Sequence, residues 1–324
     1  MTFVYILLGF LILIALAILI ASLIPFKLKG SFTPNPAKSY ADAIDRIALI
    51  RAEEDNPEVH PLCVTRVFTH GERVNNAIVF LHGFTACPDQ FDQLGRMYHE
   101  KGYNVYIPRL PRHGDQDPLG ISLQGLTAEE LAVAAMQAAD IAQGLGERVV
   151  VSGLSGGGAM TLWLSQNRSD VAVAAPIAPF LGISMIPPFL SRALGHLPRL
   201  FPDFFIWWDP INKVNNPFAA PYSDTRFPVH AALEILRLAL SAQTQGRKTR
   251  PAAGKIVLIS NANDRTVNNR DIASFTHTWE VYGEDLVTAY EFDKSLGLPH
   301  DLIRPSRPDA RTDIVYPRLM ELVG

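Results

Sequence analysis

Hydrophobic residues are most concentrated at the start of the chain, where Phe3 to Ile24 form an apolar run of 22 residues without a charge. As an α-helix this run would be about 33 Å long at about 1.5 Å per residue, which is enough to cross a hydrocarbon layer of about 30 Å. A cleaved signal peptide is the main alternative, but it would carry a basic segment before a shorter apolar run. No Lys or Arg precedes Phe3. The pattern therefore predicts a single-pass N-terminal transmembrane helix that anchors the protein.

The residues after this run predict where the anchor ends. Pro25 stops the helix, and Lys27 and Lys29 come directly after it. Basic residues beside a membrane span favour its cytoplasmic side, so these two lysines alone favour a cytoplasmic location for the rest of the chain. We expect residues 1–29 to form the anchor and residues 30–324 to form one large domain.

In that large domain, short β-branched runs alternate with helical patterns, after a Pro-rich linker and an amphipathic helix predicted at Ser39–Glu54. Buried strands are expected at Ala77–Leu81, Asn104–Ile107, Arg148–Ser152, Val171–Ala175, Lys255–Ser260 and Leu286–Phe292. Helices are expected at Asp89–Lys101, Thr127–Gly144, Gly156–Gln166 and Asn268–Trp279. Alternation of this kind predicts an α/β fold with a mostly parallel central sheet and helices on both faces.

One stretch interrupts the alternation. Residues 176–228 contain ten prolines and ten aromatic residues, and that much proline excludes long helices. We expect this stretch to form short helices and turns that lie over the sheet, as part of a lid insertion at about residues 176–250. Its rings either form a small separate core or line an apolar cleft. The lid residues expected to contact a substrate are Phe204, Phe205, Trp207 and Trp208.

The most informative motif is the segment Gly153–Gly157, GLSGG, which matches the G-x-S-x-G nucleophile elbow. A strand pattern, RVVVS, precedes it, and a helical pattern, GGAMTLWLSQ, comes after it. The sharp turn between strand and helix needs strained backbone angles at the serine, and flanking glycines remove the clashes. The helix then begins beneath Ser155, where its free N–H groups favour negative charge. This context predicts that Ser155 is a nucleophile.

A serine hydroxyl is a poor nucleophile without a base. His300 follows the last predicted strand in a short loop, which would place it at the carboxyl edge of the sheet. Asp264 follows the preceding strand, where an acid that orients the histidine would lie. The remaining histidines after the serine lie in or beside the lid or inside a helical pattern: His196, His230 and His277. The other nearby acids are better explained as turn or cap residues: Asp293 and Asp301. We therefore expect a Ser155, Asp264 and His300 catalytic triad.

Acyl transfer also needs donors for a developing oxyanion. One is expected from the backbone N–H of Gly156, directly after the nucleophile. The other is expected from Phe84, because an early strand, AIVFL, runs into His82-Gly83-Phe84-Thr85. His82 itself is expected to be a buried hydrogen-bonding residue. Beside these donors, Phe84 and Leu154 are expected to contact the substrate.

Together, HGFT after a strand, GLSGG, a lid insertion and then D…H resemble the α/β-hydrolase superfamily, and within it the carboxylesterase and monoacylglycerol-lipase-like group. The segment YIPRLPRHG, Tyr106 to Gly114, is similar to that group's P-x-L-x-G-H-G loop. The resemblance covers roughly Arg66 to the C-terminus. Arg112 stands where that loop usually has glycine, and the acid loop reads N-A-N-D instead of the common G-x-x-D.

The resemblance implies an α/β-hydrolase fold and a two-step hydrolysis of carboxylic esters through an acyl-enzyme, with no metal or organic cofactor. The aromatic lid favours apolar acyl groups, and the anchor would hold the cleft near a lipid surface, so lipid-like esters such as monoacylglycerols fit best. Thioesters, peptides and acyl transfer use the same machinery and stay open as alternatives. A tethered binding protein without catalysis is an alternative of a different class.

Composition narrows the remaining function classes. The chain has 324 residues, 48% of them hydrophobic and 19% charged, with a formal net charge of −3. There is no basic excess to neutralise phosphates, so nucleic-acid binding is not expected. Two cysteines, Cys63 and Cys87, cannot form a disulfide framework or a four-cysteine zinc site, and they leave the redox compartment open.

Overall fold

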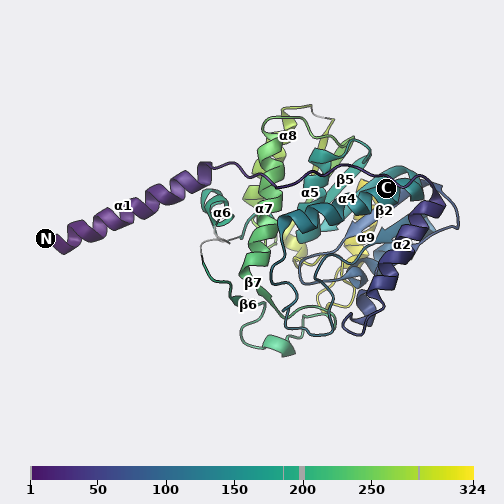
Figure 1. Ribbon diagram of the computed structural model, residues 1–324, viewed down its shortest axis with the longest axis horizontal. Helices are drawn as coiled ribbons and strands as arrows, with labels where there is room; N and C mark the ends of the chain where they lie inside the picture. The colour runs from purple at the N-terminus through teal and green to yellow at the C-terminus, as the bar shows by residue number, and fades with distance from the viewer. Residues whose placement is uncertain (1, 185, 197–200, 284) are drawn as a thin grey trace.

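The buried β-branched runs form one twisted sheet at the centre of the molecule (Figure 1). The computed structural model describes residues 2–184, 186–196, 201–283 and 285–324. Within this part of the chain the sheet has seven strands in the order β1-β3-β2-β4-β5-β8-β9. Their bounds are Arg66–Phe68, Tyr103–Ile107, Val74–Leu81, Gly146–Leu154, Val173–Ile177, Lys255–Asn261 and Val287–Phe292. Only β1 pairs antiparallel, with β3, and the other neighbouring strands of the sheet run parallel. The predicted α/β architecture is confirmed.

The helices that cover this sheet are explained by their caps and apolar faces. Ser39 accepts a hydrogen bond from the Asp42 amide and caps α2, Tyr40–Glu54, and Thr127 and Glu130 form a capping box at the start of α4, Ala128–Leu145. Helix α5, Gly156–Asn167, packs against β4 and β5 and contacts both α4 and α7, Val229–Gly246. Three further helices of the domain lie outside the lid: α3, Asp92–Glu100, α8, Asn269–Glu280, and α9, Thr312–Val323.

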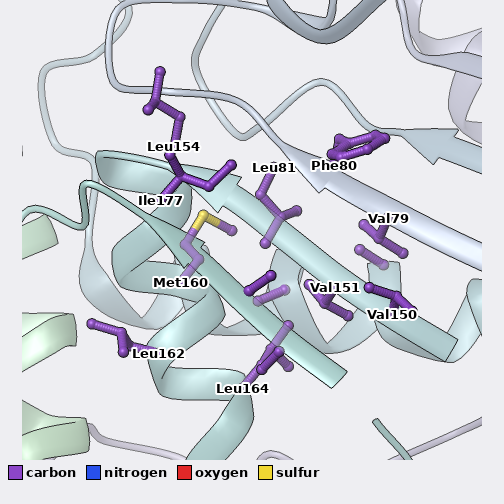
Figure 2. Close-up of a cluster of buried hydrophobic side chains, with 14 of the residues drawn as sticks. Val79, Phe80, Leu81, Val150, Val151, Leu154, Met160, Leu162, Leu164 and Ile177 are labelled. Atoms are coloured by element: carbon purple, nitrogen blue, oxygen red, sulfur yellow. The ribbon is translucent and has the colours of Figure 1, made fainter. Parts of the chain in front are cut away.

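The core lies on both faces of the central strands, and α5 covers one of these faces. Side chains of β2 and β4 meet in register, for example Val79 opposite Val151, and these strands are buried along most of their length. Figure 2 shows the strand residues beside those of α5. The labelled strand side chains are Val79, Phe80, Leu81, Val150, Val151, Leu154 and Ile177, and those of α5 are Met160, Leu162 and Leu164. Each of these is at most 1% exposed. Successive strand residues point to opposite faces of the sheet, so these side chains fill the interior on both faces, and Phe80, for example, stacks on Phe91 and not on α5.

Besides the two short strands of the lid described below, three elements were not expected from the sequence. Strand β1 is a short, half-buried edge strand without a clear apolar pattern. Helix α9 contains Pro317 in its interior, and a proline normally argues against helix because it removes a backbone donor. Helix α7 begins directly after Pro228, without a side-chain cap, and lies immediately after the proline-rich stretch.

The predicted insertion at residues 176–250 contains two kinds of structure. Its last part, α7, packs on α4 and α5 and so belongs to the layer that covers the sheet. The earlier part holds the short helix α6, Pro188–Leu194, and a two-stranded hairpin of β6, Phe205–Trp207, and β7, Arg226–Pro228. Residues 185 and 197–200 of the insertion lie outside the described residues.

The first helix, α1, spans Thr2–Leu23 and projects from the domain (Figure 1). The span Phe3–Leu23 has a mean hydropathy of 3.2, and most of its side chains are exposed, with Ser22 near its end buried against the domain. By length and composition it is a candidate membrane span, and a signal sequence near an N-terminus would meet the same description.

A disulfide joins Cys63 to Cys87. It connects the 3-10 turn Pro61–Cys63 to the 3-10 turn Pro88–Phe91, with the two Cα atoms 5.1 Å apart, within the usual range for a bridge. Both cysteines are fully buried beside Ala220 and Tyr222. The bridge therefore fixes the segment directly after the predicted oxyanion loop.

Candidate active site

Ser155 occupies the sharp turn between β4 and α5. Its backbone has φ 56° and ψ −108°, a strained conformation for a residue with a side chain. The turn is held because the Ser155 amide donates to the Ile177 carbonyl of β5, 2.9 Å away. A side chain at Gly157 would overlap the carbonyl oxygen of Leu81 at the end of β2. Glycine at this position therefore lets α5 begin directly against the sheet, with a partly exposed Ser155 at its carboxyl edge.

His300 and Asp264 lie together at the same edge of the sheet. His300 Nδ1 and Asp264 Oδ2 are 2.6 Å apart, and Asp264 Oδ1 accepts hydrogen bonds from the amides of Thr266 and Val267. Burial opposes ionisation of Asp264, but the charge and hydrogen bond of His300 outweigh it, so the pKa of this carboxyl is lowered. Asp264 is therefore ionised at neutral pH and suited to hold the imidazole in one orientation.

Two asparagine side chains join the loops that carry this pair. Asn261 Nδ2 donates to the carbonyls of Leu298 and Pro299, and Asn263 Nδ2 donates to Leu298 at 3.0 Å. This is the structural use of the N-A-N-D sequence, which departs from the more common G-x-x-D. The asparagines hold the residues just before His300 against the loop of Asp264, a role that the sequence pattern did not reveal.

The predicted oxyanion donors are neighbours in space. A Cβ built on Gly156 would lie 3.1 Å from the Phe84 amide nitrogen, so the backbones of these two residues approach closely beside Ser155. His82 is buried behind them, where its Nε2 accepts from the Leu110 amide and its Nδ1 contacts the Gly83 carbonyl. Burial and the neighbouring His113 lower the pKa of His82 well below its usual range, so it is a neutral structural residue.

Ser155 and His300 both line a cavity of about 670 Å³, a volume typical of small-molecule sites. Its lining is mostly apolar and also includes polar side chains from the lid and from the loops at the sheet edge. The apolar residues include Phe180, Ile206, Trp208, Phe227, Leu233 and Ile235, and the polar residues include Gln90, Asn216, Thr225, Asn263, Arg265 and Arg304. Among the described residues, no group of three His, Cys, Asp or Glu side chains is arranged to hold a metal ion.

The predicted substrate contacts divide into two groups. Phe84, Leu154 and Trp208 line the cavity, whereas Phe204, Phe205 and Trp207 do not. Successive side chains of a strand point to opposite sides, and Ile206 is the residue of β6 that lines the cavity. The rings of Phe205 and Trp207 instead lie 4.3 Å and 5.5 Å from the Arg226 guanidinium. The sequence did not reveal this register, and the lining residues Ile206 and Phe227 were missed.

Asp224 is a buried carboxyl in the cavity wall, 4% exposed. Its amide donates to the carbonyl of Thr85 beside the predicted oxyanion loop. Burial, together with the negative charges of Asp115 and Asp117, raises the pKa of Asp224 to about 8. The group is therefore mostly protonated at neutral pH and adds no full charge to the cavity.

A strand-to-helix serine elbow, a buried Asp–His pair and a lidded cavity at the carboxyl edge of a mostly parallel sheet are the features of an α/β-hydrolase. Comparison with protein families agrees: residues 78–310 match the alpha/beta hydrolase family. The match spans well over half of the chain, so the protein belongs to the α/β-hydrolase family.

Individual relatives are lipases and esterases. A thermostable monoacylglycerol lipase of Bacillus sp. (strain H-257) is 26% identical over 190 residues, which is 56% of this chain and 68% of the relative. A structure from a study of LipS and LipT, two metagenome-derived lipolytic enzymes, has a TM-score of 0.59 at 17% identity and covers 82% of this chain and 99% of that one. The monoacylglycerol lipase of Paleococcus ferrophilus has a TM-score of 0.59 at 15% identity, covering 80% and 97%. The resemblance to lipases and esterases is thereby confirmed, while these structural likenesses show the fold alone.

The raised pKa of Asp224 predicts how stability depends on pH. The folded pKa of about 8 exceeds the unfolded value of about 3.9, so folding favours the protonated form, and its contribution is lost as pH rises through the folded pKa. Asp224→Asn cannot ionise. Its melting temperature relative to wild type should therefore increase between pH 5 and pH 9, measured by thermal unfolding, whereas the exposed control Asp45→Asn should behave like wild type. Parallel curves for Asp224→Asn and wild type would show that Asp224 is not held protonated.

Proposed function

We propose that this protein is a membrane-anchored serine hydrolase that cleaves carboxylic esters with apolar, lipid-like acyl groups, with Ser155, His300 and Asp264 as its catalytic triad. The observation that carries the proposal is the short hydrogen bond between His300 and a fully buried Asp264 side chain, beside a strained serine that opens to the same cavity. This is the arrangement in which a base is oriented and its charged form is stabilised.

The chemistry proceeds in two steps. Ser155 Oγ attacks the acyl carbonyl carbon while His300 Nε2 takes the hydroxyl proton, and the resulting oxyanion accepts hydrogen bonds from the amides of Phe84 and Gly156. The C–O bond to the alcohol then breaks, and His300 gives its proton to the departing alkoxide. Water attacks the acyl-enzyme with His300 as the base, which releases the acid and returns the proton to Ser155. Asp264 stays ionised throughout and stabilises the imidazolium.

The cavity supports an apolar acyl group. Aliphatic and aromatic side chains, among them Leu154, Phe227 and Leu233, make up most of the cavity lining. The similarity to a monoacylglycerol lipase favours an ester of a long acyl chain with a small polar alcohol. The alternative is a thioesterase, a serine peptidase or an acyltransferase, because these enzymes would use the same groups. Activity toward thioesters, peptides or acyl acceptors would reveal it.

The disulfide bears on the side of the membrane that the domain occupies. Lys27 and Lys29 favour the cytoplasmic side, but disulfides persist mainly in oxidising compartments, and the Cys63–Cys87 bridge is buried within the domain. We give the bridge more weight than the two lysines. In a reducing compartment the two cysteines would be free thiols, whereas their buried sulfur atoms lie at bonding distance. The proposal is therefore a domain on the non-cytoplasmic side.

Substitution of the nucleophile tests the proposed reaction. With a series of p-nitrophenyl esters from acetate to palmitate, the wild-type chain in detergent should show activity that increases with acyl length. Ser155→Ala should lower kcat by about 10^4-fold or more, and Asp264→Asn by about 10^3- to 10^4-fold. Neither should unfold the domain, which circular dichroism checks. Undiminished turnover by a folded Ser155→Ala would exclude Ser155 as the nucleophile, and inactivity of wild type toward esters but not thioesters would favour the alternative.

The state of the cysteines tests the orientation. The chain has only two cysteines, and both are buried, so membranes are quenched in acid and dissolved in denaturant before maleimide labelling counts the free thiols. We expect no labelling before reduction and two labels afterwards, together with an active alkaline phosphatase fused to the C-terminus. A Cys63→Ser variant is the control and should carry one label without reduction. Two free thiols in wild type, with an inactive fusion, would place the domain in the cytoplasm.

A further inference from the structure

The end of α1 is built into the domain and is not a loose tether. The Ser22 carbonyl accepts a hydrogen bond from Arg192 of α6, and the Ile24 carbonyl contacts the ring of His196 at 3.3 Å. The Phe26 ring stacks on His196 with centroids 4.0 Å apart. Phe26 is 3% exposed and packs in a cluster with Leu233, Leu236 and Leu240 of α7. The chain that leaves a membrane at α1 is therefore fixed to α6 and α7.

The same region carries an exposed apolar surface, which we call the apolar rim. It consists of Ile183, Phe189, Phe204, Ile206 and Trp208, each between 40% and 57% exposed. Ile183, Ile206 and Trp208 also line the cavity, so the rim borders its mouth. The Phe204 carbonyl accepts from the amide of Val229, and Val229 packs against the Phe26 cluster. Both the apolar rim and the end of α1 are therefore held by the beginning of α7.

We propose that the apolar rim rests on the surface of the bilayer that α1 crosses, so that the cavity opens toward the lipid. The proposal depends on the anchoring role given to α1 under the proposed function. Figure 1 shows α1 leaving the domain on the side that carries α6, β6 and β7, with α2 on the far side. Exposed apolar patches on proteins mark binding surfaces, and Trp is enriched where proteins meet the membrane interface. Because the end of α1 is fixed to the domain, the side that carries α6, β6 and β7 faces the bilayer.

Tryptophan fluorescence tests this orientation without requiring catalysis. Trp163 and Trp279 are at most 1% exposed inside the domain, whereas Trp208 lies in the rim. The full chain is reconstituted in phosphatidylcholine vesicles that contain phosphatidylcholine brominated near the glycerol end of its acyl chains. We expect bromine to quench the Trp208 emission, which is obtained as the difference from a Trp208→Phe variant. Equal emission with and without bromine would overturn the proposal.

Matched variants separate rim contact from anchoring. Phe189→Ser and Phe204→Ser change exposed side chains outside the cavity lining and should weaken the quenching, while Leu49→Ser, 69% exposed on α2, should not. These three variants should stay in the vesicles after alkaline extraction, and their hydrolysis of soluble p-nitrophenyl butyrate should match that of the wild type. Loss of the chain from the vesicles would contradict the anchor. Normal anchoring and esterase activity without quenching would contradict only the docking of the rim.

A second inference rests on Gln90, a residue that the reaction itself does not use. Its side chain is 4% exposed, and its Oε1 accepts from the Gly83 amide at 2.8 Å while its Nε2 donates to Asp301 Oδ1 at 3.0 Å. Gly83 precedes the predicted oxyanion donor Phe84, and Asp301 follows His300. One amide side chain thus joins the loop of the oxyanion donor to the loop of the base.

The geometry points to Gln90 as a positioning residue that keeps these two loops in register. The other carboxylate oxygen of Asp301, Oδ2, lies 3.1 Å from Arg304 Nε. The carboxylate that Gln90 binds is therefore itself held in place. Without Gln90, the Gly83 amide and Asp301 would each lose a buried partner, and the two loops would be free to shift relative to one another. Such a shift affects the transition state more than the ground state of the substrate.

A double-mutant cycle tests the link. Gln90→Met keeps length and removes both hydrogen bonds; it should lower kcat about tenfold or more with KM changed less than about twofold. Asp301→Ala should also lower kcat, and the effects of the two substitutions should not multiply in the double variant, because each breaks the same Gln90–Asp301 link. If Gln90→Met does not fold, the isosteric Gln90→Glu replaces it, since it removes the donor to Asp301. Effects on kcat that multiply, or a change in KM alone, would contradict the positioning role.

Discussion

The close approach of the first turn of α5 to the end of β2 is the constraint on which the rest of the site depends. Gly157 has no side chain and therefore packs directly against the Leu81 carbonyl. That contact forces the chain to turn within one residue, and Ser155 takes the strain at φ 56°. It also brings Gly156 beside the Phe84 amide. A single packing requirement thus exposes the serine and gathers the two amides that the proposed reaction needs.

The remaining groups of the site are held by side-chain amides that join one loop to another. Asn261 and Asn263 bind carbonyls just before His300, and Gln90 connects the loops of Phe84 and His300. These loops come after different strands, so no regular hydrogen-bond ladder fixes their spacing. Buried polar links of this kind hold a geometry that hydrophobic packing alone leaves adjustable. The disulfide at Cys87 adds a covalent restraint directly after the same oxyanion loop.

Much of the fold could be predicted from the sequence. Within the domain, a strongly periodic or uninterrupted apolar run is stable only as a helix or strand that buries its apolar side chains in the core. The strands β2, β4 and β8 were expected within a few residues, and GLSGG correctly predicted the strand-turn-helix context of Ser155. Helix α9 was not expected, because its interior Pro317 contradicts a local rule that tertiary packing overrides. The register of β6 was not readable either, because Phe204 to Trp208 are all apolar and show no alternation. The docking of Phe26 involves residues more than 200 positions apart, which no local pattern reveals.

Activation of Ser155 by a base in the cavity is central to the proposed function, and covalent trapping tests it most directly. The full chain in detergent is treated with a fluorophosphonate, and the labelled peptide is identified by mass spectrometry. We predict one adduct, on Ser155, whose formation slows strongly in His300→Ala. No adduct on a folded protein, an adduct on a different residue, or labelling of Ser155 that is independent of His300 would contradict this activation.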